Sequence, residues 1–256
     1  MTDPTSDPTD EAGDKRIGLV TGASRGIGYH CSLALAKAGY HVVAVARTQG
    51  GLEELDDAIR AEGGSTTLVP MSITDYDAID RLGAALFERY GRVDALFANA
   101  GILGPLSPVG HVPPKRWDEV MAVNVTANYR LIRSLDPLLK RSPAGRSLFV
   151  SSGAAHSARA FWAPYAASKA ALEALVRSWA KEVKSFGVTA NLLNPGATRT
   201  KMRAEAMPGE DPMTLPTAES LAPMVVSLLS PEETRTGMVY EARDGHFAEH
   251  QHPGRV

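Results

Sequence analysis

Residues 17–28 of the chain read IGLVTGASRGIG. The first four are apolar, as in a short strand that is buried in a parallel sheet. A turn of small residues follows, and then a helical pattern that has Cys31, Leu33 and Ala34 available for an inward face and Gly39 as its end. Such glycines let backbone N–H groups approach a pyrophosphate, and the helix N-terminus supplies a positive dipole end. The stretch therefore predicts a dinucleotide-binding loop, although its GxxxGxG spacing differs from the common GxGxxG and a turn that merely needs small residues is the alternative.

The next strand pattern, residues 41–46, is followed by Arg47. An acidic residue there would accept hydrogen bonds from an adenosine ribose, whereas an arginine suits a 2′-phosphate. Arg25 lies in the glycine turn, on the same side of the expected site. Two guanidinium groups close to one phosphate favour NADP(H) over NAD(H) as the cofactor, and a pair of ordinary surface arginines is the alternative.

Residues 165–169 read YAASK, which places a phenol and an ammonium four residues apart. In a helix these two positions lie on one face, one turn apart. A nearby ammonium favours the phenolate, so we expect Lys169 to lower the pKa of Tyr165 toward the range of an acid/base catalyst. Solvated pairs on ordinary helices have the same spacing, so this interpretation needs support from other motifs.

Five motifs follow one another along the chain. They are the glycine turn, which reads TGxxxGxG at Thr21, Gly22, Gly26 and Gly28, then Asn99-Ala100-Gly101, Asn124-Val125, Ser152 at 13 residues before Tyr165, and Pro195-Gly196. On these motifs the chain resembles the short-chain dehydrogenase/reductases of the 3-oxoacyl-carrier-protein reductase type, over residues 16–245. Each motif alone is weak, and their order and spacing together carry the resemblance. The resemblance implies a Rossmann-like fold and NAD(P)-dependent oxidoreductase activity.

The resemblance also implies a cofactor site that collects residues from several loops. These residues are Thr21, Gly22, Ser24, Arg25, Gly26, Ile27, Gly28, Arg47, Ser72, Asn99, Ala100, Gly101, Tyr165, Lys169, Pro195, Gly196, Thr198 and Thr200. Two of them depart from the family pattern. Ser72 stands where many relatives carry an aspartate that contacts the adenine, and Thr198 stands where an aliphatic residue often faces the nicotinamide amide. A threonine hydroxyl can still hydrogen-bond a carboxamide or a phosphate.

For four residues the resemblance implies catalytic roles. Tyr165 is the general acid of a carbonyl reduction, or the base of the reverse reaction, and Ser152 donates a hydrogen bond to the substrate oxygen as an oxyanion stabiliser does. Lys169 holds the nicotinamide ribose. Asn124 anchors a water that relays protons to Lys169, and a side chain bonded to backbone is the alternative for an asparagine within a helix.

Two regions are candidates for contact with the substrate. Phe161 and Trp162 lie between the predicted catalytic serine and tyrosine, where the family builds its substrate wall. Residues 198–216 mix prolines, glycine and charges with methionines and have little periodicity. They predict a mobile lid that places Met202 or Met207 against the substrate, and the alternative is a surface segment that has no closing role.

Strand and helix patterns alternate along the body of the chain. Helices are predicted at residues 52–61, 76–90, 115–135, 165–186 and 218–229, and further strands at 66–69, 95–98, 147–151, 189–193 and 238–240. This alternation predicts one α/β domain, with a doubly wound parallel sheet of about seven strands and helices on both faces. Ligands of such sheets bind beyond the carboxyl ends of the strands, so the motif residues are expected to meet at one edge.

Composition agrees with a single globular domain. The 256 residues are 44% apolar and 22% charged, and a net charge of -2 gives no indication of nucleic-acid binding. No apolar run approaches the length of a membrane span, and the single cysteine, Cys31, is expected in the core. We expect a cytoplasmic protein without membrane contact.

The polar composition of the ends suggests limits for the domain. Residues 1–15 are expected to be a disordered tail, residues 16–245 the NAD(P)-binding catalytic domain, and residues 246–256 a C-terminal tail. No metal site is expected, because the histidines near the C-terminus lack acidic or cysteine partners at ligand spacing. These histidines are His246, His250 and His252.

Three functions remain open at this point. The first is NADP(H)-dependent hydride transfer between nicotinamide and a small-molecule ketone or secondary alcohol, including 3-oxoacyl thioesters. The second is an NAD-dependent dehydrogenase of polyols or other secondary alcohols, which the two arginines disfavour. The third is a non-catalytic dinucleotide-binding regulator, which need not retain a serine, a tyrosine and a lysine together. The resemblance implies a homodimer or homotetramer, to whose interface Tyr129, Trp179 and Phe186 could contribute if the core does not bury them.

Overall fold

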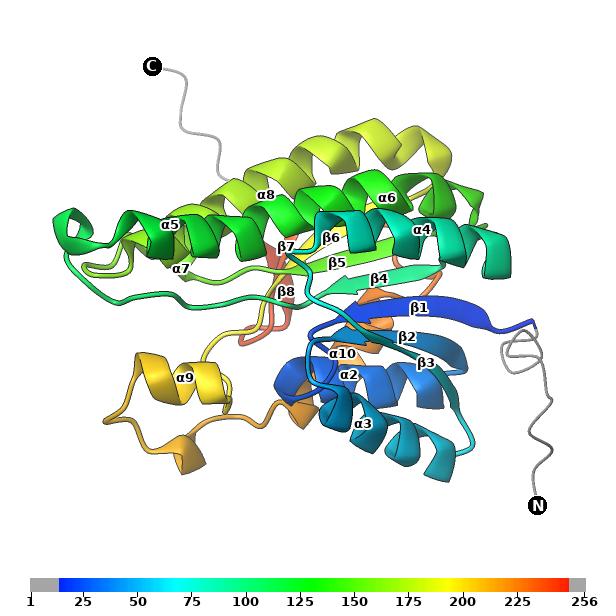
Figure 1. Ribbon diagram of the computed structural model, residues 1–256, viewed down its shortest axis with the longest axis horizontal. Helices are drawn as coiled ribbons and strands as arrows, with labels where there is room; N and C mark the ends of the chain where they lie inside the picture. The colour runs from blue at the N-terminus through cyan, green and yellow to red at the C-terminus, as the bar shows by residue number, and fades with distance from the viewer. Residues whose placement is uncertain (1–13, 249–256) are drawn as a thin grey trace.

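The computed structural model describes residues 14–248, so most of the predicted N-terminal tail, together with His250 and His252, lies outside the described residues. Eight strands of the described part form one sheet in the order β3-β2-β1-β4-β5-β6-β7-β8 (Figure 1). They are β1 (Arg16–Thr21), β2 (Tyr40–Ala46), β3 (Ser65–Pro70), β4 (Ala95–Ala98), β5 (Arg146–Val150), β6 (Thr189–Asn194), β7 (Val239–Glu241) and β8 (His246–Ala248). The predicted doubly wound α/β fold is confirmed.

Strand β8 adds one strand to the sheet that the sequence predicts. All neighbouring strands from β3 to β7 pair in parallel, whereas β8 pairs antiparallel with β7. The ring of Phe247 on β8 packs edge-on against Tyr240 on β7, with 5.0 Å between the ring centroids. The sheet therefore extends into residues 246–248, which the sequence analysis assigned to a tail. A strand of three residues is too short to show the alternation by which strands are recognised.

Helices cover both faces of the sheet. Figure 1 shows α4, α5, α6 and α8 on one face and α2, α3 and α10 on the other. Their bounds are α2 (Gly26–Lys37), α3 (Gln49–Ala61), α4 (Tyr76–Tyr90), α5 (Pro114–Met121), α6 (Ala127–Arg141), α8 (Ala163–Val183) and α10 (Ala222–Leu228), and the shorter helices α7 (Ala154–Ser157) and α9 (Lys201–Ala206) lie at the carboxyl edge of the sheet. None of the helices between residues 14 and 248 has the length and apolarity that a membrane span requires.

Two hydrophobic cores lie on opposite sides of the strands. Leu19 belongs to the core beneath α4, α6 and α8, whereas its neighbour Val20 belongs to the core beneath α2, α3 and α10. Successive side chains of a strand point to opposite faces, so a strand that is covered on both faces is apolar at nearly every position. All seven residues of β2 are buried for this reason. Cys31 lies in the second core, as predicted, and burial raises the pKa of its thiol to about 12.

The predicted helix at residues 115–135 is divided in the structure. Helix α5 ends at Met121, a π-helical turn covers Ala122–Thr126, and α6 then continues to Arg141 with Pro137 inside it. The π-helical turn contains Asn124. Such turns insert one residue into a helix, often at functional sites, and have no composition signal of their own. The segment 218–229 is likewise divided into a 3₁₀ turn at Glu219–Leu221 and α10.

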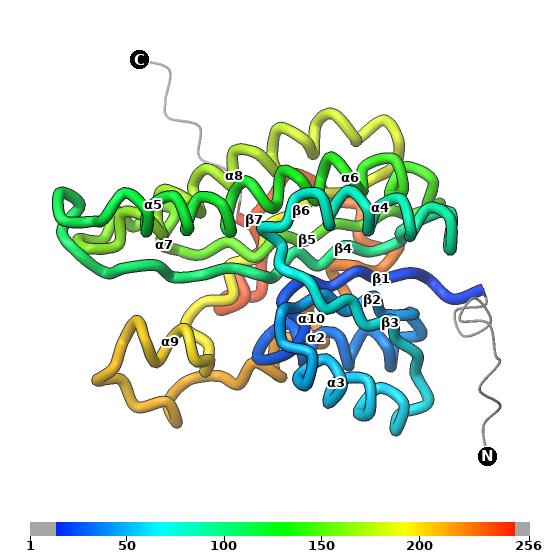
Figure 2. The backbone as a smooth tube through the Cα atoms, viewed as in Figure 1, coloured from blue at the N-terminus to red at the C-terminus, as the bar shows by residue number. Residues whose placement is uncertain are grey.

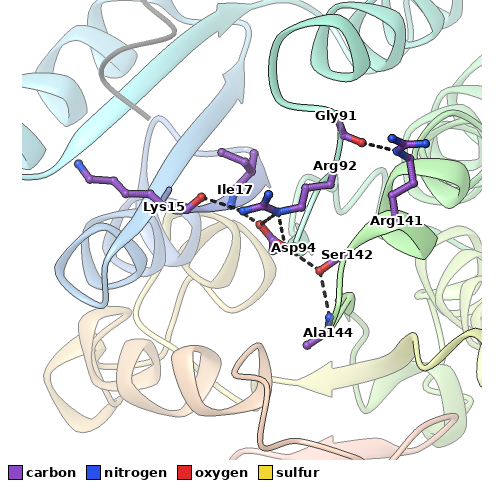
Figure 3. Close-up of polar contacts among 8 residues, drawn as sticks. All are labelled: Lys15, Ile17, Gly91, Arg92, Asp94, Arg141, Ser142 and Ala144. Atoms are coloured by element: carbon purple, nitrogen blue, oxygen red, sulfur yellow. Dashed lines mark hydrogen bonds and ion pairs between the residues drawn. The ribbon is translucent and has the colours of Figure 1, made fainter. Parts of the chain in front are cut away.

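A buried aspartate ties together the amino ends of the strands (Figure 3). Asp94, directly before β4, accepts hydrogen bonds from the backbone N–H of Ile17 at 2.8 Å and from Ser142 Oγ at 2.6 Å. Arg92 Nε lies 3.2 Å from both carboxylate oxygens, and its Nη2 donates to the carbonyl of Lys15. These bonds join the starts of β1 and β4 to the turn before β5, and they leave the opposite, carboxyl edge for a binding site.

Candidate active site

A cavity of about 900 Å³ lies at the carboxyl edge of the sheet. It is lined by residues that follow β1, β2, β3, β4, β5 and β6, as expected for a doubly wound fold. The predicted residues that line it are Gly22, Ser24, Arg25, Gly26, Ile27, Arg47, Ser72, Asn99, Ala100, Gly101, Ser152, Trp162, Tyr165, Lys169, Pro195, Gly196, Thr198, Thr200 and Met202. Thr21, Gly28, Asn124 and Phe161 do not line it.

Two of the residues outside the lining support the glycine turn from behind. Thr21 Oγ1 accepts hydrogen bonds from the backbone N–H groups of Asn99 and Ala100, both at 3.1 Å. A Cβ at Gly28 would lie only 2.2 Å from the carbonyl oxygen of Gly22, so no larger residue fits there. The turn at Gly22, which has φ +68, and the loop after β4 are thereby held as one unit. Thr21 and Gly28 thus shape the loop that other residues present to the cavity.

The end of the cavity at this loop suits an anionic cofactor. Helix α2 begins here, its N-cap Arg25 makes no side-chain capping bond, and its first turn carries no acidic residue. Backbone N–H groups at a helix N-terminus bind phosphate oxygens. Arg25 and Arg47 both line the cavity and are exposed, and among residues 14–248 no carboxylate pairs with either guanidinium. These donors fit a dinucleotide pyrophosphate with an additional phosphate beside it.

Ser152, Tyr165 and Lys169 meet in the same cavity. Tyr165 and Lys169 lie one turn apart on α8, and Ser152 follows β5, where its hydroxyl is close enough to lower the pKa of the Tyr165 phenol. Lys169 Nζ lies 5.6 Å from the centroid of the Tyr165 ring and donates to the carbonyl of Val150 at 2.7 Å. Burial lowers the pKa of Lys169 to about 8, and the charge of Glu173 opposes this change.

The expected depression of the Tyr165 pKa is not found in this structure. Burial raises the pKa of the phenol above its ordinary value, and the hydrogen bond with Ser152 opposes the rise. The side chain is packed in an apolar cluster with Leu103 and Ala206, which disfavours the charged phenolate. Lys169 donates its hydrogen bond to a backbone carbonyl. In this state its ammonium therefore does not offset the burial of Tyr165.

The side chain of Asn124 is fully buried and fully bonded. Its Oδ1 accepts from the backbone N–H of Ile102, and its Nδ2 donates to the carbonyl of Ile102 and to Ser168 Oγ, all at 2.9 Å. The backbone groups that it holds belong to the loop after β4 and not to its own helix. A Cβ at Gly101 would lie 3.2 Å from Asn124 Oδ1 and 3.5 Å from Lys169 Nζ, so the two side chains flank this glycine. A water relay from Asn124 to Lys169 stays a prediction.

The substrate end of the cavity is apolar. Leu103, Ala154, Tyr165 and Ala206 form a small cluster, against which Trp162 and Met202 pack. The Trp162 ring stands edge-on to Tyr165, with 6.1 Å between centroids. The structure does not bring Phe161 to this wall: its φ of +72 turns it outward and leaves it 58% exposed.

Residues 198–216 lie beside this end of the cavity. Figure 2 shows the chain leaving the body before α9 (yellow) and returning (orange) to α10. Thr200 caps α9 by accepting from the backbone N–H of Arg203, and the Arg203 guanidinium makes two hydrogen bonds to Glu210, at 2.6 and 2.7 Å. Thr198 Oγ1 donates to the carbonyl of Pro195 at 3.0 Å. The segment contains more regular structure than its sequence predicts, and its mobility stays a prediction.

Several residues of the site were not predicted. The part of the cavity near Ser72 is lined in addition by Met71, Ile73 and Thr74, and Ser72 Oγ lies 2.8 Å from Thr74 Oγ1. Glu173, which is buried one turn beyond Lys169, was also missed, although its i+4 spacing was a usable signal. Among residues 14–248, no group of three or more His, Cys, Asp or Glu side chains is placed to hold a metal ion.

Comparison with known proteins identifies the family. The family model described as short chain dehydrogenase matches residues 16–211. The chain is 36% identical over 242 residues to "Uncharacterized oxidoreductase YciK" of Escherichia coli K12, covering 93% of this chain and 96% of that protein. It is also similar to two solved short chain dehydrogenases, one from Shigella flexneri complexed with NADP (TM-score 0.86) and one from Escherichia coli CFT073 complexed with NADPH (TM-score 0.84), each 35% identical and each covering 92% of this chain and 99% of the other.

The chain therefore belongs to the short-chain dehydrogenase/reductase family, and the resemblance noted in the sequence is confirmed. It is an oxidoreductase that acts between an alcohol and a carbonyl with a nicotinamide dinucleotide.

Proposed function

We propose that this protein transfers hydride between NADP(H) and a small-molecule ketone or secondary alcohol. The observation that carries the proposal is that Ser152, Tyr165 and Lys169 line the same cavity as the unpaired guanidinium groups of Arg25 and Arg47. The first three groups suit proton transfer at a carbonyl oxygen, and the two arginines suit a 2′-phosphate. A non-catalytic dinucleotide-binding protein would not need a phenol, a hydroxyl and an ammonium in contact.

NADP(H) is the cofactor that these residues fit best. The N-terminus of α2 and the glycine turn would hold the pyrophosphate, and Arg25 and Arg47 would hold the 2′-phosphate. Two related structures carry NADP and NADPH, which supports the same choice for this chain. When bound, NADPH would supply the hydride in the reducing direction, and Lys169 would hold its nicotinamide ribose.

The chain itself supplies the proton and stabilises the charge on the substrate oxygen. A phenol with its ordinary pKa of about 10 is protonated at neutral pH, and burial raises the pKa of Tyr165 further, so this side chain can act as the general acid of a reduction. Its Oη–H donates to the carbonyl oxygen as negative charge develops there. Ser152 Oγ–H donates to the same oxygen. Once Tyr165 has given its proton to the substrate oxygen, the ammonium of Lys169 stabilises the resulting phenolate.

The apolar substrate end favours apolar carbonyl compounds, including the 3-oxoacyl thioesters. Leu103, Trp162 and Met202 would contact the chain on either side of the carbonyl. Residues 198–216 act as a lid in this proposal, since Met202 is attached to them. Closing such a lid would exclude water from the hydride transfer.

A homodimer or homotetramer and a cytoplasmic location stay predictions. Tyr129 on α6 and Phe186 after α8 are 48% and 57% exposed, which supports a role in contact with a second copy. Trp179 is buried and donates its Nε1–H to Asp136, so it belongs to the chain's own core.

The test is turnover of a panel of ketones, acyl thioesters and secondary alcohols with NADPH, NADH and their oxidised forms. We expect reduction of apolar ketones with NADPH in preference to NADH. A preference for NAD(H) with polyols would replace this proposal by the second function that the sequence left open. Tight NADPH binding without turnover of any compound in the panel would favour the regulator.

A further inference from the structure

A buried carboxylate that the proposed mechanism does not use lies beside the catalytic group. Glu173 on α8 is only 1% exposed. It follows Lys169 by one helical turn, and Arg177 follows it by another, so Tyr165, Lys169, Glu173 and Arg177 form a stripe at i+4 spacing. A buried carboxylate is costly unless its oxygens are paired and hydrogen-bonded. The partners of Glu173 therefore indicate why it is there.

Three successive residues at the end of β5 contact this stripe. The carbonyl of Val150 accepts from Lys169 Nζ at 2.7 Å. Ser151 Oγ donates to Glu173 Oε1 at 2.6 Å. Ser152 is close enough to Tyr165 for its hydroxyl to lower the pKa of the phenol. The strand end and the helix are thus joined residue by residue, and Glu173 holds the position between the two catalytic contacts.

The second oxygen of Glu173 holds the chain on the other side of the catalytic serine. His156 Nε2 lies 2.9 Å from Glu173 Oε2, and Arg177 Nη2 donates to the same oxygen at 2.8 Å. His156 belongs to α7, which follows Ser152 and precedes Tyr165 in the chain. One carboxylate therefore bonds the residue before Ser152 and a residue four positions after it.

We propose that Glu173 is a positioning residue of the active site: it fixes Ser152 against Tyr165 through Ser151 and His156, and it places a negative charge one helical turn from the Lys169 ammonium. The inference rests on the proposed function, which makes these three groups the catalytic ones. It explains why a charged residue occupies a place on α8 that an apolar side chain could fill.

The charged and neutral groups around Lys169 and Glu173 can be compared element by element. On α8, the titratable groups that face Lys169 or Glu173 are Tyr165 and Arg177, and α7 contributes His156. The end of β5 and the π-helical turn contribute neutral groups to these contacts, namely the carbonyl of Val150, Ser151 and Asn124. On α5, Arg116 and Glu119 line the same cavity and pair with each other. Glu173 is the nearby charge that raises the pKa of Lys169 against the effect of burial.

The test is the pH dependence of NADPH binding in Glu173→Gln. The amide keeps the shape of the side chain and an oxygen that can accept from Ser151, but it removes the charge. In the parent enzyme, the NADPH affinity plotted against pH should fall on the alkaline side, because Lys169 loses its proton near its pKa of about 8. This fall is the alkaline limb of the binding profile. In the variant we expect this limb to move toward neutral pH by about one unit, so that affinity well above the parent's limb falls roughly tenfold. With a turned-over substrate, kcat should fall as well, because Ser152 is less firmly placed.

Glu182→Gln is the matched control, since Glu182 is an exposed carboxylate on the same helix. Its binding limb should coincide with that of the parent. A Glu173→Gln variant that folds, is less stable and has an unmoved limb would overturn the proposal and leave Glu173 a purely structural residue.

If Glu173→Gln does not fold, Ser151→Ala and His156→Gln test the positioning role instead. Each removes only one partner of Glu173, a neutral hydroxyl in Ser151 and a half-exposed imidazole in His156. Ser151→Ala should lower kcat while leaving the NADPH limb in place, and His156→Gln should lower kcat in the same way. Unchanged kcat in both would refute the positioning role. NADPH binding requires no substrate, so the limb can be measured even if every compound in the panel fails, and failure of the proposed function stays distinguishable from failure of this inference.

Discussion

His41 on β2 offers a quantitative test of how the fold depends on pH. The side chain is fully buried, with Nδ1 2.9 Å from Ser65 Oγ and Nε2 2.9 Å from Thr67 Oγ1 and 3.1 Å from Tyr90 Oη. Hydroxyl groups can bond both nitrogens of a neutral imidazole. A protonated ring would place a charge in a buried site. Burial, followed by the charges of Arg89 and Lys15, lowers the pKa of His41 from 6.5 to about 4.

The direction in which the free energy of unfolding changes with pH depends on the pH at which the folded and the unfolded states each bind the proton of His41. The unfolded chain protonates His41 near pH 6.5, whereas the folded protein does so only near pH 4. The contribution of His41 to the free energy of unfolding is therefore complete above pH 6.5, falls as the pH is lowered, and levels off below pH 4. The two pKa values correspond to about 3 kcal/mol, a large share of the 5–15 kcal/mol that is typical of a domain.

Urea unfolding at a series of pH values, for the parent and for His41→Gln, measures this contribution. Glutamine can bond the neighbouring hydroxyls but does not titrate, so the variant should lose about 3 kcal/mol less than the parent between neutral pH and pH 4. Carboxylates titrate in both proteins and cancel in the comparison. Parallel pH profiles of the two proteins would refute the reasoning and show that His41 is protonated in the folded state.

The remaining predictions concern the active site. Tyr165→Phe should retain NADPH binding and lose turnover by about 10²–10⁴-fold or more, because only the proton donor is removed; steady-state kinetics within tenfold of the parent would contradict the assignment. Arg25→Ala and Arg47→Ala should each weaken NADPH binding by about 1–3 kcal/mol and leave NADH binding nearly unchanged in fluorescence titrations, and equal losses for both cofactors would assign the arginines to the fold. Residues 198–216 should gain hydrogen-exchange protection when NADPH and a turned-over substrate are both present; unchanged protection would make the segment a fixed wall.

The sequence predicts the placement of a residue correctly where that placement follows from a local pattern. The glycine turn, Arg47 and the pair Tyr165 and Lys169 stand at strand ends or on one helix face, and both kinds of position can be derived from short patterns. The doubly wound topology then brings these patterns to one edge. This is why nearly all of the predicted lining was found in a single cavity although it comes from distant parts of the chain.

The predictions that were wrong concern properties that depend on the surroundings of a residue and not on its type. The π-helical turn around Asn124 depends on contacts with the loop after β4, which no periodicity encodes. Phe161 faces outward because its backbone lies in the left-handed region. The pKa of Tyr165 rises because apolar residues from three other segments desolvate it, whereas the sequence shows only the neighbouring Lys169.

Residues 199 and 217 form a parallel bridge, so the two ends of the segment beside the substrate cavity meet at one point of the body. Within the segment, Arg199 donates to the carbonyls of Pro212 and Leu215, and Arg203 pairs with Glu210, so these polar contacts lie inside the segment. Its contacts with the body include the packing of Met202 and Ala206 against the apolar cluster at Tyr165. A loop whose ends are already joined can change in length or composition at little entropic cost to the rest of the chain. This segment could therefore diverge between related enzymes, and carry a change of substrate with it, while α8 and the groups that handle the proton stay where they are.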